Sequence, residues 1–108
     1  MLRRTLLLLV GLTPALSAQA LPRTTAERTN YTATSTSADV GVFLDSLELA
    51  GLPVTVTAMG TSAQGRPIYL VIASDPGVTS AAEAKASGKL VVYVQANIHA
   101  GEVEGKEA

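Results

Sequence analysis

Two apolar runs, residues 67–73 (PIYLVIA) and 89–96 (KLVVYVQA), constrain the fold of this chain most strongly. A strand that is apolar at nearly every position is typical of a sheet covered on both faces, whereas a half-exposed strand alternates. The preceding run at 54–58 (VTVTA) does alternate and predicts a half-exposed strand. Strands covered on both faces require helices around them, so the sequence predicts a layered α/β domain.

A helix is predicted just before the first strand. Four apolar residues recur there at the spacing of one helical face: Val40, Phe43, Leu44 and Leu47. Thr36 or Ser37 is suited to cap the N-terminus of this helix. Gly51, followed by Pro53, is expected to end it. The apolar face of the helix should therefore lie on the sheet.

The remaining segments are predicted to be connections, apart from the last. Residues 21–37 are rich in threonine without a hydrophobic period, so we expect an extended surface segment. Residues 59–66 contain two glycines and have the length of a hairpin-like turn. Residues 74–88 predict a surface excursion. Residues 101–108 resemble the opening of a second helix, and we expect the chain to be the N-terminal part of a longer protein.

Residues 1–20 have the pattern of a secretory signal peptide. Arg3 and Arg4 form a basic start, an apolar core follows, and Ala18-Gln19-Ala20 is a small-x-small cleavage site. The apolar core is much shorter than the roughly 20 residues that span a bilayer. We therefore expect cleavage after Ala20, a secreted or periplasmic protein, and no membrane span after removal of the signal.

Composition excludes several classes of function. The chain has a net charge of −1 and no basic stripe, which argues against nucleic acid as a partner. Because cysteine is absent, disulfides, thiolate metal sites and cysteine nucleophiles are excluded. Asn30-Tyr31-Thr32 matches a glycosylation acceptor, but such short patterns do not establish modification. Any bound metal must be held by histidine and carboxylates.

One pair of residues is a candidate metal site. His99, the single histidine, follows the second apolar run, and Glu102 lies three residues later. In open α/β sheets, ligands gather at the carboxyl ends of strands. Neutral imidazole and carboxylate are typical ligands of a catalytic zinc site, which uses three protein ligands. A purely structural interpretation is a strand-end histidine with a local hydrogen bond and a glutamate that serves the next helix.

Two segments resemble a known family. Asn97-Ile98-His99-Ala100-Gly101-Glu102 is similar to the zinc-binding segment of the zinc metallocarboxypeptidases of the carboxypeptidase A type. Upstream, Gly60-Thr61-Ser62-Ala63-Gln64-Gly65-Arg66-Pro67-Ile68 resembles the turn that joins the first two strands in that family. The resemblance covers about residues 38–108, with the elements in the same order.

The resemblance implies a fold, a cofactor and an activity. The family fold is an α/β/α sandwich around a mixed sheet, of which residues 38–108 would be the N-terminal part. His99 and Glu102 inherit the roles of zinc ligands. A third ligand, another histidine, and the glutamate that acts as general base are expected beyond Ala108, so no catalytic residue is assigned here. Peptides or proteins would be the substrates, hydrolysed at the C-terminal bond by a zinc-activated water, and a piece ending at Ala108 would be inactive alone.

Departures from the family leave alternatives open. Gly101 stands where many digestive members have arginine, so substrate preference is not carried over. Glu104 and Glu107 are interpreted as solvated or supporting helix carboxylates, and Arg66 as a partner in a local ion pair. An acyl-amino-acid amidohydrolase of the same fold, or a non-catalytic secreted binding module, remains an alternative function. The oligomeric state stays open.

Overall fold

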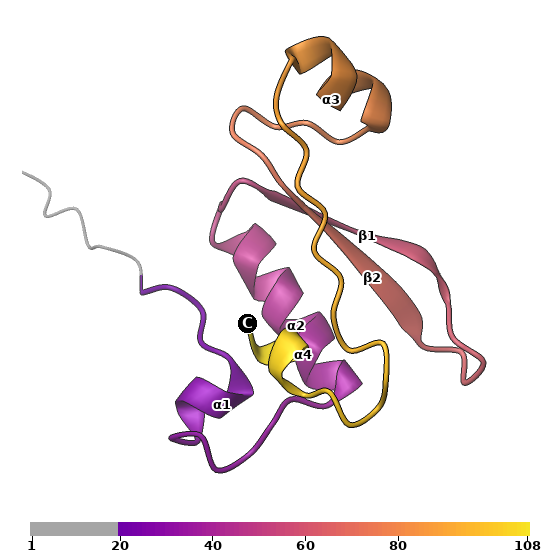
Figure 1. Ribbon diagram of the computed structural model, residues 1–108. Coiled ribbons are helices and arrows are strands. Elements are labelled where there is room, and N and C mark those ends of the chain that lie inside the picture. Colours follow the sequence, from indigo (N-terminus) through magenta and orange to yellow (C-terminus); the bar gives the residue numbers. More distant parts are fainter. Residues whose placement is uncertain (1–19) are drawn as a thin grey trace, which may run out of the picture.

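The computed structural model describes residues 20–108, so the expected signal peptide lies outside the described residues except for Ala20. Figure 1 shows α2 beside a hairpin of two strands, with α3 at one end of the molecule and α1 and α4 toward the other. The elements follow in the order α1 (Thr25–Arg28), α2 (Ser37–Leu49), β1 (Val54–Thr61), β2 (Pro67–Ala73), α3 (Ala81–Ser87) and α4 (Glu104–Glu107).

Local signals determine both ends of α2, as the sequence predicted. The Thr36 hydroxyl accepts the Asp39 N–H at 3.2 Å, and the Thr36 N–H donates to the Asp39 carboxylate at 2.8 Å. This reciprocal capping box satisfies two backbone donors that the helix cannot pair internally. At the other end, Gly51 takes the left-handed conformation (φ 69°) and its N–H donates to the Glu48 carbonyl at 2.9 Å.

Removing the cap should have a measurable cost. We expect Thr36→Ala to lower the free energy of unfolding by about 1 kcal/mol, because the Asp39 N–H loses its acceptor. Urea denaturation followed by circular dichroism would measure this difference. Thr36→Ser keeps the hydroxyl and is the matched control. Equal stability of the alanine and serine variants would contradict the capping role.

The two strands form an antiparallel hairpin, which confirms the predicted hairpin-like connection. The register pairs Val54 with Ala73 and Thr57 with Leu70, and it shifts by a bulge between Ala58 and Gly60. The turn is closed by the Ser62 N–H, which donates to the Arg66 carbonyl at 2.8 Å.

The core lies where α2 packs on the hairpin. Leu44 of α2 is buried, with 7% of its surface exposed. Gly41 is the point of closest approach, because a Cβ there would lie 2.6 Å from the Tyr69 hydroxyl oxygen. The Glu48 carboxylate accepts the Val56 N–H at 2.9 Å and ties the end of the helix to β1. Helix α2 therefore packs on the hairpin, whereas Phe43 of the predicted apolar face lines hollows beside the N-terminal segment.

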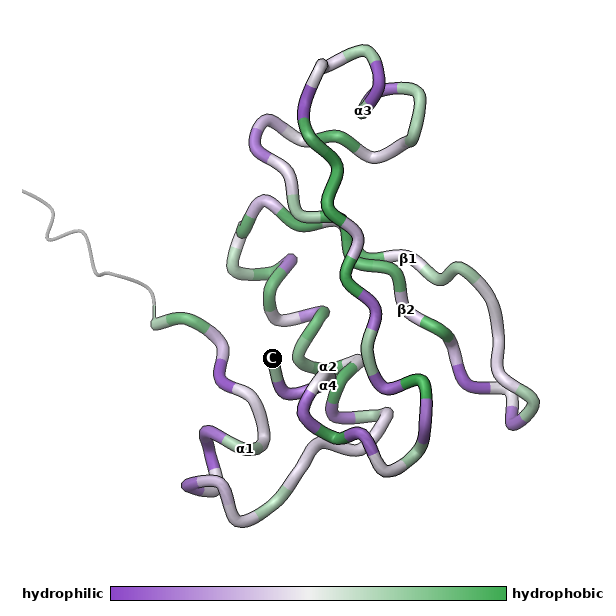
Figure 2. The backbone as a smooth tube through the Cα atoms, in the orientation of Figure 1, coloured by the Kyte–Doolittle hydropathy of each residue, from purple (hydrophilic) through white to green (hydrophobic). Residues whose placement is uncertain are grey.

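The two apolar runs are less buried than the sequence predicted. In β2, Ile68 and Val71 are 41% and 40% exposed, so burial on both faces is wrong for this strand. Residues 89–96 were expected to form a buried strand, but they form no strand, and Leu90 and Val94 are 90% and 82% exposed. Figure 2 shows this run as an apolar stretch of extended chain. The apolar pattern indicates a tendency to burial, but a strand also needs a hydrogen-bonded neighbour. The sheet described in residues 20–108 consists of β1 and β2, so the run 89–96 has no paired strand in it.

The segment 21–37 is not extended throughout, which corrects a second expectation. It contains α1, where the Thr24 hydroxyl accepts the Glu27 N–H and the Glu27 carboxylate accepts the Thr24 N–H. Ala26 in this turn is buried. The helix begins because of a capping box, which is a polar signal that a search for hydrophobic periodicity does not detect.

The later connections agree with the sequence. The segment 74–88 contains α3, which begins after the Ser80 cap and has no buried residue. Lys89 links the two ends of this connecting segment, because its Nζ donates to the carbonyls of Asp75 at 2.6 Å and Pro76 at 3.1 Å. The predicted second helix is present as the short α4. Within residues 20–108, none of the helices has the length and apolar character needed to cross a membrane.

Candidate metal centre

The segment between the exposed apolar run and α4 forms a tight turn that carries His99 and Glu102. Asn97 enters it in the left-handed conformation (φ 57°), which asparagine tolerates better than most residues. The Glu102 N–H then donates to the His99 carbonyl at 3.0 Å. This backbone geometry brings the side chains at both ends of the turn together.

The imidazole and the carboxylate are in direct contact. His99 Nδ1 lies 2.6 Å from Glu102 Oε1, and the His99 N–H donates to Glu102 Oε2 at 3.2 Å. The two side chains are 79% and 43% exposed, respectively. The two side chains are therefore in contact with each other and partly exposed to solvent.

The contact changes the acidity of the carboxyl group. The hydrogen bond from the His99 side chain, followed by that from the His99 N–H, lowers the pKa of Glu102 below its ordinary value of 4.5. Hydrogen bonds that donate to a carboxylate stabilise its charged form. Glu102 is consequently anionic at neutral pH, as a metal ligand must be.

A titration tests this arrangement. In the metal-free protein, His99→Ala should raise the pKa of Glu102 toward 4.5, because the main donor is removed. The pair stabilises the fold above pH 4.5, and this contribution is lost as the pH falls through the lowered pKa. Carboxyl chemical shifts followed against pH by NMR would measure the pKa. Glu83, whose pKa is lowered by Thr79, is the internal control. An unchanged Glu102 titration in the variant would contradict the contact.

The donor chemistry of the turn fits zinc in part. Imidazole nitrogen and carboxylate oxygen are both ordinary zinc ligands, but a catalytic site uses three protein ligands. Among residues 20–108, no three histidine or acidic side chains come together as a metal site. The structure therefore brings the two predicted ligands into contact with each other.

The neighbouring glutamates do not complete the site. Glu104 is exposed on α4. The Glu107 carboxylate accepts the backbone N–H groups of Ser35 and Ala26 instead. Glu107 is therefore a tethering group rather than a solvated one.

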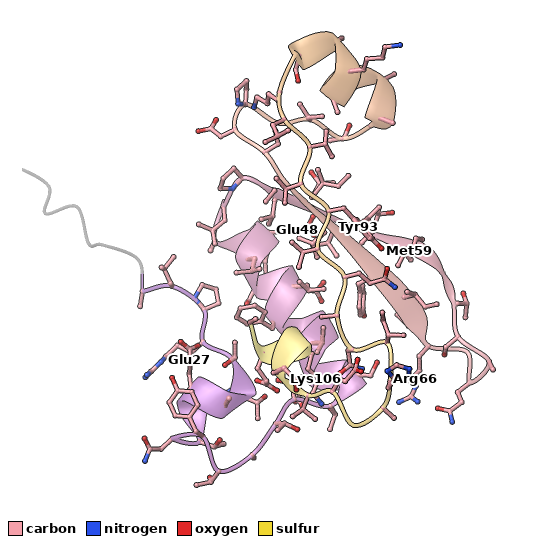
Figure 3. All side chains as sticks on the ribbon, viewed as in Figure 1. Glu27, Glu48, Met59, Arg66, Tyr93 and Lys106 are labelled. Carbon is pink, nitrogen blue, oxygen red and sulfur yellow. The ribbon has the colours of Figure 1, made fainter. Side chains whose placement is uncertain are left out.

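Arg66 differs from the prediction. Its guanidinium donates to the side-chain carbonyl of Gln64 within the hairpin turn. Within the described part of the chain it forms no ion pair with a carboxylate. The turn itself supplies an amide acceptor two residues away, so no carboxylate is required there. Figure 3 shows Arg66 beside the beginning of β2.

Two residues with structural importance near the turn were missed by sequence reasoning. Gly105 lies in α4, where a Cβ would come 2.0 Å from the Ala96 Cβ. A glycine inside a helical pattern is a signal of close packing, since it costs about 1 kcal/mol relative to alanine. Lys106 donates to the Ser35 carbonyl at 2.6 Å, a long-range contact without a sequence signal.

Two hollows in the described part of the chain do not coincide with the turn. One of about 490 Å³ is lined by residues of the N-terminal segment and α2 together with Glu107 and Ala108. Neither His99 nor Glu102 lines it. His99 and Glu102 therefore lie on a solvent-exposed turn outside these hollows.

The structure describes a small α/β protein with a solvent-exposed contact between a histidine and a glutamate. A family model described as zinc carboxypeptidase matches residues 42–108. The chain therefore belongs to the zinc carboxypeptidase family, whose members are zinc-dependent peptide hydrolases, and the resemblance drawn from the two motifs is confirmed. Comparisons with curated proteins and with solved structures gave no match.

Proposed function

We propose that this protein is a secreted zinc carboxypeptidase that removes residues from the C-terminus of peptides or proteins. The observation that carries the proposal is the His99–Glu102 pair, whose donor atoms lie 2.6 Å apart inside the range that matches the family. The fold we propose for the complete domain is the α/β/α sandwich around a mixed sheet that the resemblance implies.

In this proposal, His99 and Glu102 hold the metal. When bound, zinc supplies a Lewis acid that lowers the pKa of a water molecule to about 7 and polarises the scissile carbonyl. Glu102 contributes an anionic oxygen and His99 a neutral nitrogen. A further histidine ligand and the glutamate that moves the proton are proposed to lie beyond Ala108. Residues 1–108 alone offer two donors, so we expect them to bind zinc weakly and to be inactive.

The choice of substrates tests the reaction class. The complete protein should cleave peptides with a free C-terminal carboxylate, and amidation of that terminus should strongly reduce the rate. Release of the last amino acid, followed by mass spectrometry, measures this difference. Chelation of zinc should abolish cleavage, and added zinc should restore it.

Two other outcomes would contradict the proposal. Hydrolysis of N-acyl amino acids in preference to peptides would indicate an amidohydrolase instead. Peptide binding without any hydrolysis by the zinc-loaded protein would indicate a binding module.

Secretion is a separate part of the proposal. The basic start at Arg3 and Arg4 and the small residues Ala18 and Ala20 support cleavage after Ala20. N-terminal sequencing of the exported protein should begin at Leu21. A mature protein that retains Met1 would contradict both the cleavage and the compartment.

A further inference from the structure

The last turn of α4 is fastened to a segment about 70 residues earlier in the chain. The Glu107 carboxylate accepts the Ser35 N–H through Oε1 and the Ala26 N–H through Oε2, the latter at 3.3 Å. The adjacent Lys106 Nζ donates to the Ser35 carbonyl at 2.6 Å. Both backbone polar groups of Ser35 are thus held by consecutive side chains of α4, and we refer to these contacts of Glu107 and Lys106 as the α4 clasp.

Burial supports the importance of the clasp. Ser35 is 6% exposed and Ala26 is 8% exposed, which places them among the few buried residues described in this chain. Backbone groups removed from water need partners, and hydrogen bonds to a charged group are about twice as strong as neutral ones. Ser35 N–H bonding lowers the pKa of Glu107, so the carboxylate is charged at neutral pH. Figure 3 shows Lys106 on the side of α4 that faces this N-terminal segment.

The opposite side of α4 is seated on the chain that leads into the candidate metal turn. A Cβ at Gly105 would lie 2.0 Å from the Ala96 Cβ and 3.2 Å from the Ala96 Cα. Ala96 lies three residues before His99, and Glu102 lies two residues before α4 begins. α4 is therefore in contact with the N-terminal segment on one side and with the entry to the turn on the other.

We propose that Glu107 is a positioning residue for the zinc ligands, which acts by fixing α4 against the N-terminal segment so that the turn bearing His99 and Glu102 is held in place. This inference rests on the proposed zinc site. Lys106 supports the same contact through the Ser35 carbonyl. The turn itself is exposed and short, and its own hydrogen bonds are few. Rigidity has to come from the elements attached to it, since metal sites bind tightly when groups behind the ligands restrict their motion.

The test compares two glutamates of the same helix in the complete protein. Glu107→Gln should raise the Kd for zinc about tenfold, as measured by competition with a chromophoric chelator. In the metal-free protein, it should also accelerate amide hydrogen exchange at Ser35 and at Glu102, whose N–H closes the turn. Glu104→Gln makes the same chemical change at an exposed position and should alter neither quantity more than twofold. Lys106→Met should weaken zinc binding in the same direction and provides a second variant if Glu107→Gln does not fold.

The outcomes separate the inference from the proposed function. A wild-type protein without zinc affinity would overturn both. Tight zinc binding by the wild type, with an unchanged Kd in folded Glu107→Gln and Lys106→Met, would overturn the positioning role alone. Faster exchange at Ser35 without faster exchange at Glu102 would also overturn it, because the clasp would then be a local tether that does not reach the turn.

Discussion

Glu102→Gln and His99→Ala should each strip zinc from the complete protein and abolish peptide hydrolysis. Each substitution removes one of the two donor groups that the structure brings to the same turn. Glutamine keeps the shape of the side chain but loses the anionic charge, and alanine removes the nitrogen donor. Since even residues behind the ligands can change metal affinity 10–100-fold, loss of a ligand should raise the Kd for zinc more than about 100-fold.

Metal analysis of the purified variants, together with hydrolysis rates, measures this effect. Glu104→Gln is the matched control, because it removes a nearby exposed carboxylate that does not touch His99. The structural interpretation of the pair, a local hydrogen bond at the beginning of a helix, predicts a different result. One equivalent of zinc and equal rates in wild type and Glu102→Gln would support that interpretation.

The second large effect is expected at Gly105. Gly105→Ala should destabilise the protein by about 1–3 kcal/mol, because its Cβ would overlap the Ala96 Cβ. This net loss already includes the usual gain of about 1 kcal/mol for alanine over glycine in a helix, because the Ala96 Cβ has no rotamer that would relieve the overlap. Thermal or urea unfolding of the complete protein would measure the loss. Because α4 would be displaced, zinc affinity should fall as well.

Rescue distinguishes this packing effect from a general cost of substitution. Adding Ala96→Gly removes the atom that the new Cβ meets at 2.0 Å, so the double variant should recover much of the stability lost in Gly105→Ala. Gly77→Ala is the control, since a Cβ there meets nothing within 4 Å and should change stability by less than about 0.5 kcal/mol. Additive effects of the two substitutions at 96 and 105 would contradict the predicted contact.

The elements that the sequence predicted correctly depend on signals within a few residues. The start of α2 follows from the Thr36 cap, its end from Gly51, and the hairpin from the glycine-containing turn before Arg66. The contact between His99 and Glu102 is local as well, because a separation of three residues across a turn allows the two side chains to touch. These features need no information about distant parts of the chain.

The incorrect predictions concern contacts that local patterns do not specify. The run 89–96 has the composition of a buried strand, but whether it pairs depends on a neighbour elsewhere in the chain. The same limit explains the exposure of β2. The extended structure wrongly expected for all of 21–37 has a different cause, because the Thr24–Glu27 capping box is a local signal that hydrophobic periodicity does not detect.

The residue types and their spacing were sufficient to establish the chemistry available at the turn: one imidazole, one carboxylate and no thiol. The zinc carboxypeptidase family was also recognisable from two short motifs. The contacts of α4 that we propose to hold this turn in place are visible only in the tertiary structure. Glu107 and Ser35 are 72 positions apart, and Gly105 meets Ala96 through a close approach of two backbones. Such contacts depend on how separate elements pack, and packing is a property of the folded chain rather than of any short segment.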